Sequence, residues 1–145
     1  NIFVLFLFLI LISFDSYGGW FDNTVCVETD AQIRSGIIYL LNETKPFTGK
    51  NSCEWNEDGQ VNSKGEVKDG KKEGKWTFWN ENGQKKAEGN FKDGKQDGKW
   101  TYWFENGQIW WEGNYKDGKR NGKQTRWFEN GQIEAQENYK DGKLQ

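Results

Sequence analysis

Histidine and methionine are absent from the 145 residues, proline occurs once and cysteine twice. The lack of histidine removes the usual general base and the commonest metal ligand of proteins. It therefore excludes catalytic sites of the Cys–His and Ser–His–Asp types. No aspartate or glutamate departs from the periodic pattern described below in a way that indicates a glycosidase pair. We expect a protein that is not an enzyme, with no catalytic residues, no cofactor and no metal.

The charged residues also argue against a nucleic-acid partner. Residues 1–58 carry 3 basic and 8 acidic side chains, whereas residues 59–145 carry 17 basic and 14 acidic ones. A nucleic-acid site needs a concentrated basic stripe, and a small excess spread over so many residues does not provide one. We interpret most of these charges as a solvated surface.

Aromatic residues and glycine are abundant instead, and they recur with a period of 24 residues. Asn-Gly-Gln begins at Asn82, Asn106 and Asn130, Asp-Gly-Lys begins at Asp69, Asp93, Asp117 and Asp141, and Trp55, Trp79, Trp103 and Trp127 keep the same step. A fixed period of this length indicates an array of small units, each of which contacts mainly its neighbours.

The first residues are of a different kind. Ile2 to Ile12 is an unbroken apolar run, followed by small residues at Ser16 and Gly18, which is typical of a secretory signal peptide. We expect residues 1–18 to be that signal, with its start truncated because neither methionine nor a basic residue precedes the run. The alternative is a retained membrane anchor, although the run is shorter than the ~20 residues of a spanning helix. The signal predicts an exported protein, periplasmic, secreted or held in the cell envelope.

If the protein is exported, its two cysteines, Cys26 and Cys53, are candidates for a disulfide. An even number of cysteines in an oxidising compartment permits one disulfide, which would tie the acidic leader (residues 19–36) to the first repeat. The alternative is a pair of buried thiols, because the Cα separation that decides the matter is not given by the sequence.

One repeat has the pattern of a β-hairpin. Lys75–Trp79 is β-branched and aromatic, Asn80–Gly83 has turn residues, Gln84–Phe91 alternates as a return strand, and Lys92–Lys95 is the next turn. The alternation places Lys85, Ala87, Gly89 and Phe91 on one, buried face, where the glycine leaves room for a neighbouring ring. Their counterparts are Ile109, Trp111, Gly113 and Tyr115, and then Ile133, Ala135, Glu137 and Tyr139.

The first strands of the hairpins give two sets of aromatic residues. We interpret Trp55, Trp79, Trp103 and Trp127 as a structural row, because this row persists in the last full unit. A second set comprises Trp76, Phe78, Trp100, Tyr102 and Trp110. If it is open to solvent it is a binding face; the alternative is that its rings pack between hairpins.

The unit at residues 37–58 is degenerate and is expected to cap the array, as atypical terminal repeats do. In it, Ile37–Leu41 has the pattern of a return strand and Pro46–Gly49 that of an approach to a first strand ending at Trp55. The array as a whole spans residues 37–145, with later units at 59–82, 83–106 and 107–130 and a partial one at 131–145.

The repeats resemble the bacterial variant of the MORN repeat. The resemblance lies in Gly74–Trp79, Glu81–Gln84 and Glu88–Lys95, and in the later copies at 98–119 and 122–143. It implies an all-β fold, an elongated single-layer antiparallel sheet of stacked hairpins, and a scaffold or interaction role. Many bacterial relatives carry the label of a YwqK-type antitoxin. Gln124, Arg126 and Glu137 depart from the pattern, with polar residues in place of two aromatics and a glycine.

The function predicted first is therefore an exported, non-enzymatic module that binds or scaffolds another protein. An antitoxin or immunity role is an alternative that the family label suggests. Binding of a glycan or cell wall through the aromatic rows is a second alternative, because sugars stack on exposed tryptophan. No nucleic acid is expected as a partner, and membrane association is expected only if the N-terminal segment is retained.

Overall fold

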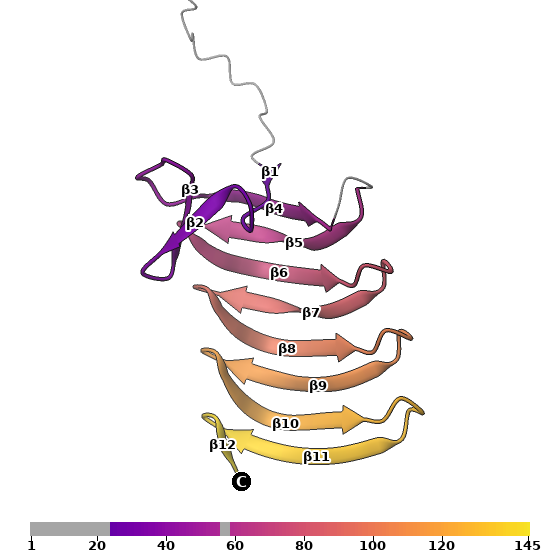
Figure 1. Cartoon of the computed structure of the whole chain (residues 1–145). Coiled ribbons are helices and arrows are strands. Elements are labelled where there is room, and N and C mark those ends of the chain that lie inside the picture. Colours follow the sequence, from indigo (N-terminus) through magenta and orange to yellow (C-terminus); the bar gives the residue numbers. More distant parts are fainter. Residues whose placement is uncertain (1–23, 56–58) are drawn as a thin grey trace, which may run out of the picture.

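The computed structural model describes residues 24–55 and 59–145, which form one long sheet and a small separate hairpin (Figure 1). The signal peptide predicted at residues 1–18 lies outside the described residues. In spatial order, the strands of the ten-stranded sheet are β1 (Thr24–Val25), β4 (Gly49–Glu54), β5 (Val61–Lys68), β6 (Lys71–Trp79), β7 (Lys85–Lys92), β8 (Lys95–Trp103), β9 (Ile109–Lys116), β10 (Lys119–Trp127), β11 (Ile133–Lys140) and β12 (Lys143–Leu144). From β4 to β12 every strand pairs antiparallel with its neighbour, as expected for stacked hairpins, and only β1 is parallel to its partner.

The two sets of turns predicted from the sequence alternate between the two sides of this sheet. Asp93 and Gly94 have φ values of 51° and 79°, so they form a two-residue turn of the type that suits the twist of a hairpin. At the other side the amide of Asn80 donates to the carbonyl of Gln84 over 2.8 Å. There the side chain of Asn82 accepts from the amide of Gln84 over 3.0 Å. The repeated Asp-Gly and Asn-Gly pairs therefore fix where each strand ends.

Each long strand after such an Asp-Gly turn contains a β-bulge at a glycine. Gly74, Gly98 and Gly122 have φ values of 65°, 72° and 85°, a conformation that favours glycine, and the strand pairing shifts next to them. The long strands curve in the same sense, so the whole stack is a bent sheet (Figure 1). The bulge redirects the side chains that follow it, including Trp76 and Trp100.

A second shift of register lies at the Asn-Gly side. Trp79 pairs with Lys85 although Phe78 pairs with Ala87, so one residue is skipped. Paired residues of antiparallel strands point to the same face, and Lys85 therefore lies on the face of Trp79 rather than on that of Ala87. The same shift puts Ile109 and Ile133 on the outside, which contradicts their predicted place on the buried face.

The first end of the array is covered by residues that precede it. β2 (Ala31–Arg34) and β3 (Ile37–Leu40) pair with each other in a sheet of their own, so the prediction that 37–41 is a return strand of the array is wrong. The hairpin is attached to the Asp-Gly turn by a hydrogen bond from Ile38 N to Gly70 O, and the segment that follows it by one from Gly70 N to Phe47 O. Ile38 and Phe47 are buried against Val67 and Trp76.

Cys26 and Cys53 form a disulfide with a Cα–Cα separation of 4.5 Å, so of the two alternatives left open by the sequence the structure has the bridge between the leader and β4 rather than two free thiols. Beside it, the fully buried Asn51 accepts a hydrogen bond from the amide of Val27 over 2.9 Å and donates to Ser63. The segment that follows β1 is therefore fastened to β4 by one covalent bond and one buried amide.

Candidate functional site

One face of the sheet carries a continuous ladder of rings, which we call the aromatic face. It consists of Trp76, Phe78, Phe91, Trp100, Tyr102, Trp111 and Tyr115. Ring centroids are 5.9 Å apart for Trp76 and Phe78 and 5.9 Å for Trp100 and Tyr102, and Phe91 meets Trp100 edge-on at 5.0 Å. Such contacts stabilise the stack beyond the burial of the rings alone.

Glycine on the neighbouring strand makes this ladder close-packed. A Cβ at Gly65 would overlap the ring of Trp76, and one at Gly89 would overlap the ring of Trp100. Each indole also donates to a backbone carbonyl 3.0 Å away, Trp76 to Glu66 and Trp100 to Asn90. The space predicted beside Gly89 is therefore present, and the ring of Trp100 fills it.

Trp76 and Trp100 are only 1% and 2% exposed, so the binding face predicted at Trp76, Phe78, Trp100, Tyr102 and Trp110 is wrong for these two. The alternative interpretation, in which the rings pack between hairpins, describes them. Phe78 and Tyr102 are half-buried in the same ladder, and Trp110 alone of the five is largely open, at 42%. The bulges at Gly74 and Gly98 explain why Trp76 and Trp100 are buried, because each bulge turns the tryptophan that follows it back over the preceding strand.

The opposite face, which we call the charged face, holds the row predicted to be structural. Trp79, Trp103 and Trp127 are half-buried there rather than forming the core. Around them lie ion pairs such as Lys75–Glu88 at 3.0 Å and Lys99–Glu112 at 2.7 Å. The most deeply buried tryptophans are therefore Trp76 and Trp100 and not those of the row predicted to be structural.

Trp55 does not belong to that row. The connection from Trp55 to Gln60 has six residues, whereas the one from Asn80 to Gln84 has five. Both segments are closed by the same backbone hydrogen bond, from Trp55 N to Gln60 O and from Asn80 N to Gln84 O. Trp55 is therefore the counterpart of Asn80, outside the strand, and it is 38% exposed. The step from Trp55 to its counterpart Asn80 is therefore 25 residues rather than 24.

The aromatic ladder is interrupted in the hairpin of β10 and β11, which we call the third repeat; the first repeat is the hairpin of β6 and β7 and the second that of β8 and β9. Gln124 occupies the place of Trp76 and Trp100, over Gly113, and its Nε2 donates to the carbonyl of Asn114 over 3.0 Å, as the indoles do. The amide thus keeps the hydrogen bond of the missing indole but not its volume. Its Oε1 is buried without a hydrogen-bond partner.

Trp111 takes part of the volume that the third repeat lacks. The equivalent residue of the previous return strand is Ala87, and both residues are buried. The ring of Trp111 comes close to Gly113, packs at 5.4 Å from Tyr102 and reaches Tyr115 at 5.8 Å. A large residue on β9 thus compensates for a small one on β10.

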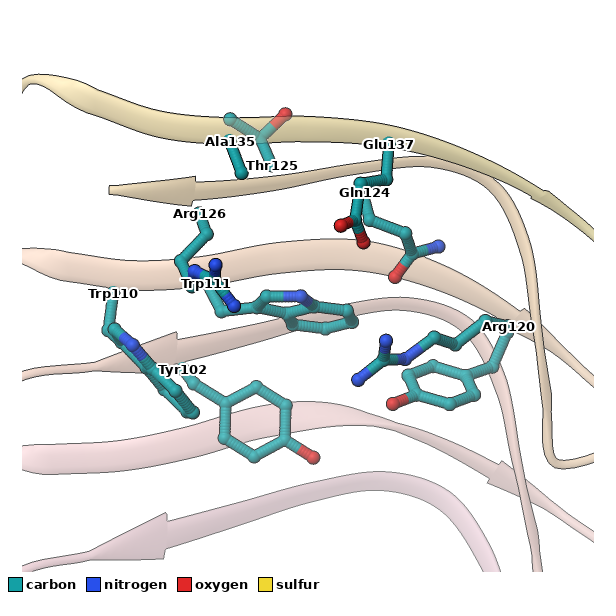
Figure 2. Close-up of a pocket in the computed structure, with 10 residues that line it drawn as sticks. Tyr102, Trp110, Trp111, Arg120, Gln124, Thr125, Arg126, Ala135 and Glu137 are labelled. Carbon is teal, nitrogen blue, oxygen red and sulfur yellow. The ribbon is translucent and has the colours of Figure 1, made fainter. Parts of the chain in front are cut away.

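The compensation is incomplete and leaves a hollow of about 310 Å³ (Figure 2). Its aromatic walls are Tyr102, Trp110, Trp111 and Tyr115, and its polar groups are Arg120, Gln124, Arg126 and Glu137. Arg126 is engaged with Glu134 at 2.6 Å, and Glu137 accepts from the hydroxyl of Tyr139 at 2.9 Å. The hollow therefore combines open ring surface with hydrogen-bonding groups.

Arg120 belongs to a row of polar residues at the margin of the ladder, with Lys72 and Gln96 at the same place in the earlier repeats. The Nζ of Lys72 lies 4.2 Å from the centre of the Trp76 ring, and burial there lowers the pKa of Lys72. The guanidinium of Arg120 lies farther from its rings, 5.8 Å from Trp111 and 5.3 Å from Tyr139. Within the described residues it has no carboxylate partner at ion-pair distance.

The sequence pattern did not identify this hollow as a site, although it contained the signal. Gln124, Arg126 and Glu137 were noted only as departures from the repeat, and Arg120 was not noted at all. Residues 24–55 and 59–145 contain no group of three or more Cys, Asp or Glu side chains placed to hold a metal ion. Over the same residues no helix is long and apolar enough to cross a membrane.

Comparison with known proteins agrees with the repeat geometry. The model of the MORN repeat variant family matches residues 72–93, 96–117 and 120–141, which are the three hairpin units whose glycines, turns and rings are described above. No curated protein sequence matches the chain. Residues 72–141 are thus three repeats of the MORN repeat variant family, whose repeats generally mediate binding.

Proposed function

We propose that this MORN repeat protein is an exported, non-catalytic module that binds another protein at the hollow of the third repeat. The observation that carries the proposal is the asymmetry of the aromatic face. Its first end is closed by Ile38 and Phe47, whereas at Gln124 the ladder stops and leaves Trp110 open beside the hollow. Tryptophan is among the residues that dominate the binding energy of protein interfaces, and Trp110 is open to solvent beside polar groups.

Export is supported by two independent features. The Cys26–Cys53 bridge is of the kind that persists in oxidising compartments and is rare in the cytosol. The apolar run at 2–12, which lies outside the described residues, has the composition of a secretory signal. Both features favour a partner in the envelope or outside the cell.

The test is capture of partners by matched variants. Oxidised protein is immobilised and exposed to the envelope fraction of its own organism, in parallel with Trp110→Ala at the hollow and Ile33→Ala on the cap hairpin. Ile33 is the matched control because it is an apolar residue 71% exposed and remote from the hollow. We expect a protein retained by the unmodified chain and by Ile33→Ala but lost from Trp110→Ala. Identical retention by all three, or retention of nothing specific, contradicts the proposal.

Glycan binding is a second candidate that the same hollow favours. Sugar rings stack on exposed aromatic faces, and Glu137, Gln124 and Arg120 supply acceptors and donors for hydroxyl groups. A change in tryptophan fluorescence on addition of soluble cell-wall polysaccharide, absent in Trp110→Ala, is the result expected for this candidate.

A further inference from the structure

We propose that the hollow receives an aromatic side chain of the partner protein, an indole or phenol, in the place of the ring that the third repeat lacks. The proposal rests on the proposed function and names the group that the site recognises. It is based on three features of the third repeat: a missing ring, a cation that contacts fewer rings than its counterpart Lys72, and an unpaired acceptor.

The missing ring follows from the equivalence of the three units. Trp76 with Phe78, and Trp100 with Tyr102, hold the places that Gln124 and Arg126 hold in the third unit. Gln124 and Arg126 line the hollow (Figure 2). The space is therefore bounded on one side by Tyr102 and Trp111 in the way that each earlier ring is bounded by its neighbours. A planar ring continues the ladder.

The cation is Arg120. At the same place in the first unit, Lys72 lies close over Trp76 and also within 5.3 Å of Phe78 and 5.4 Å of Phe91. Of the three counterparts of these rings, Arg120 retains only Tyr139, to whose hydroxyl it also donates over 3.3 Å. The other two are Gln124 and Arg126, and the ring of Trp111 replaces them only in part, at 5.8 Å. A cation within about 6 Å of a ring centre is attracted to its face. An incoming ring therefore acquires a contact that is already positioned.

The acceptor is the Oε1 of Gln124. The side chain is only 2% exposed, and its Nε2 is held by Asn114 and Gly122, which fixes the orientation of the amide. Oε1 is left without a donor and is itself buried over Gly113, on the side of the amide that faces Trp111 in Figure 2. A donor in the hollow reaches it when the amide moves away from Gly113. An unpaired buried acceptor is unfavourable, so a ligand that brings an N–H or O–H is preferred. This favours tryptophan or tyrosine over phenylalanine.

The test uses two small probes that differ only in the donor. Indole carries the N–H and 1-methylindole does not, and each is titrated into the oxidised full chain while ¹H–¹⁵N NMR spectra are recorded. We expect indole to produce saturable shifts at the indole N–H of Trp111 and the amide of Gly113, with 1-methylindole about three- to tenfold weaker. Arg120→Met is expected to weaken indole about two- to fivefold. The matched control is Arg34→Met, which removes an arginine that lies 3.9 Å over Tyr39 on the cap hairpin and leaves indole binding unchanged.

A blocking variant tests the location. Trp111→Ala with Gln124→Trp gives β9 and β10 the residues that β7 and β8 hold at the same places, Ala87 and Trp100, and is expected to abolish the shift of the Gly113 amide while the protein remains folded. The proposal is overturned if indole gives no saturable shift, if it binds the blocked variant equally well, or if 1-methylindole binds as tightly. It is also overturned if methyl β-glucoside gives the shifts and indole does not, because that result assigns the site to a glycan.

The proposal of a site for an aromatic ring and the proposal of a protein-binding function can fail independently. If a partner is captured through Trp110 but millimolar indole neither shifts the spectrum nor releases it, the ring proposal fails and the binding module stands. If indole binds as expected and no protein is captured, the ring site stands and the protein-binding function fails. Release of the captured protein by indole but not by 1-methylindole supports both.

Discussion

The indole of Trp100 lies directly on Gly89 of the neighbouring strand, where even a methyl group would overlap the ring. Gly89→Ala therefore forces Trp100 out of its place, and it also strains the hydrogen bond from the indole to Asn90. Overpacking of a filled core typically costs about 1–3 kcal/mol. Urea unfolding followed by tryptophan fluorescence should show a loss of stability of this size.

The control for this substitution lies at the same place in the last unit, where the glycine is replaced by Glu137. No ring is described above that residue, so Glu137→Ala should change the free energy of unfolding by no more than about 0.5 kcal/mol. Equal stability of Gly89→Ala and the unmodified protein would show that the close contact of glycine and indole is not needed for the stack.

The hairpins and turns of this fold could be predicted from the sequence because they depend on short, local signals. Asp-Gly and Asn-Gly pairs determine the turns, and the alternation in Gln84–Phe91 determines the strand. Which side chains are buried could not be predicted in the same way, because burial depends on the β-bulges. The bulges at Gly74, Gly98 and Gly122 change the side-chain period of two within a strand, and no pattern of apolar residues reveals such a change.

The candidate site was missed for a related reason. A repeat is easiest to recognise where its copies agree, and Gln124 and Arg126 were therefore interpreted as loss of regularity. Their meaning depends on contacts across strands, such as the approach of Trp111 to Gly113, that only a register accurate to one residue shows. The skipped residue at Lys86 and the extra residue between Trp55 and Gln60 both changed that register.

The compensation between Trp111 and Gln124 predicts strong coupling between two substitutions. Trp111→Ala alone removes a buried ring and should cost about 3–5 kcal/mol. Gln124→Trp alone places a second ring against Trp111 and should cost about 1–3 kcal/mol. The double variant reproduces the pair formed by Ala87 on β7 and Trp100 on β8, and it should be more stable than the sum of the single effects by at least about 1 kcal/mol.

Urea unfolding of the four proteins in a double-mutant cycle measures this coupling. The comparable pair, Ala87 on β7 and Trp100 on β8, shows that the exchanged arrangement fits the same backbone. Additive effects within the error of the cycle would mean that the two side chains do not share one volume.

The disulfide should matter mainly for the N-terminal end. Cys26 and Cys53 are 27 residues apart in the sequence, and closing a loop of that length stabilises the folded state by about 3.5 kcal/mol in the chain-entropy account. Reduction should therefore lower the thermal midpoint. It should also expose the amide of Val27, which is held by Asn51, to rapid hydrogen exchange.

Two comparisons control this prediction. Cys26→Ser with Cys53→Ser should reproduce the effect and should no longer respond to reductant. The amides of β9, at the other end of the sheet, should keep their protection, because each unit contacts mainly its neighbours. Protection of Val27 that survives reduction would mean that the buried amide of Asn51 is sufficient without the bridge.

The carboxylate of Glu88 should make the stability of the charged face depend on pH. Partial burial acts to raise the pKa of Glu88, but hydrogen bonds and charge from Lys85 at 2.8 Å and Lys75 at 3.0 Å outweigh it, and the net pKa is lowered. A carboxylate with a lowered pKa in the folded state stabilises the fold above its unfolded pKa, about 4.3 for glutamate. That stabilisation is lost as the pH falls through the lower, folded value.

Glu88→Gln should therefore be less stable than the unmodified protein at pH 7, and the difference should shrink steadily below about pH 4. Urea midpoints measured at a series of pH values from 7 to 2.5 test this directly. Lys85→Met should reduce the same pH dependence, since it removes the nearer of the two cations. A difference between Glu88→Gln and the unmodified protein that stays constant over the whole series would assign the effect of the substitution to the hydrogen bond from the hydroxyl of Thr77 rather than to charge.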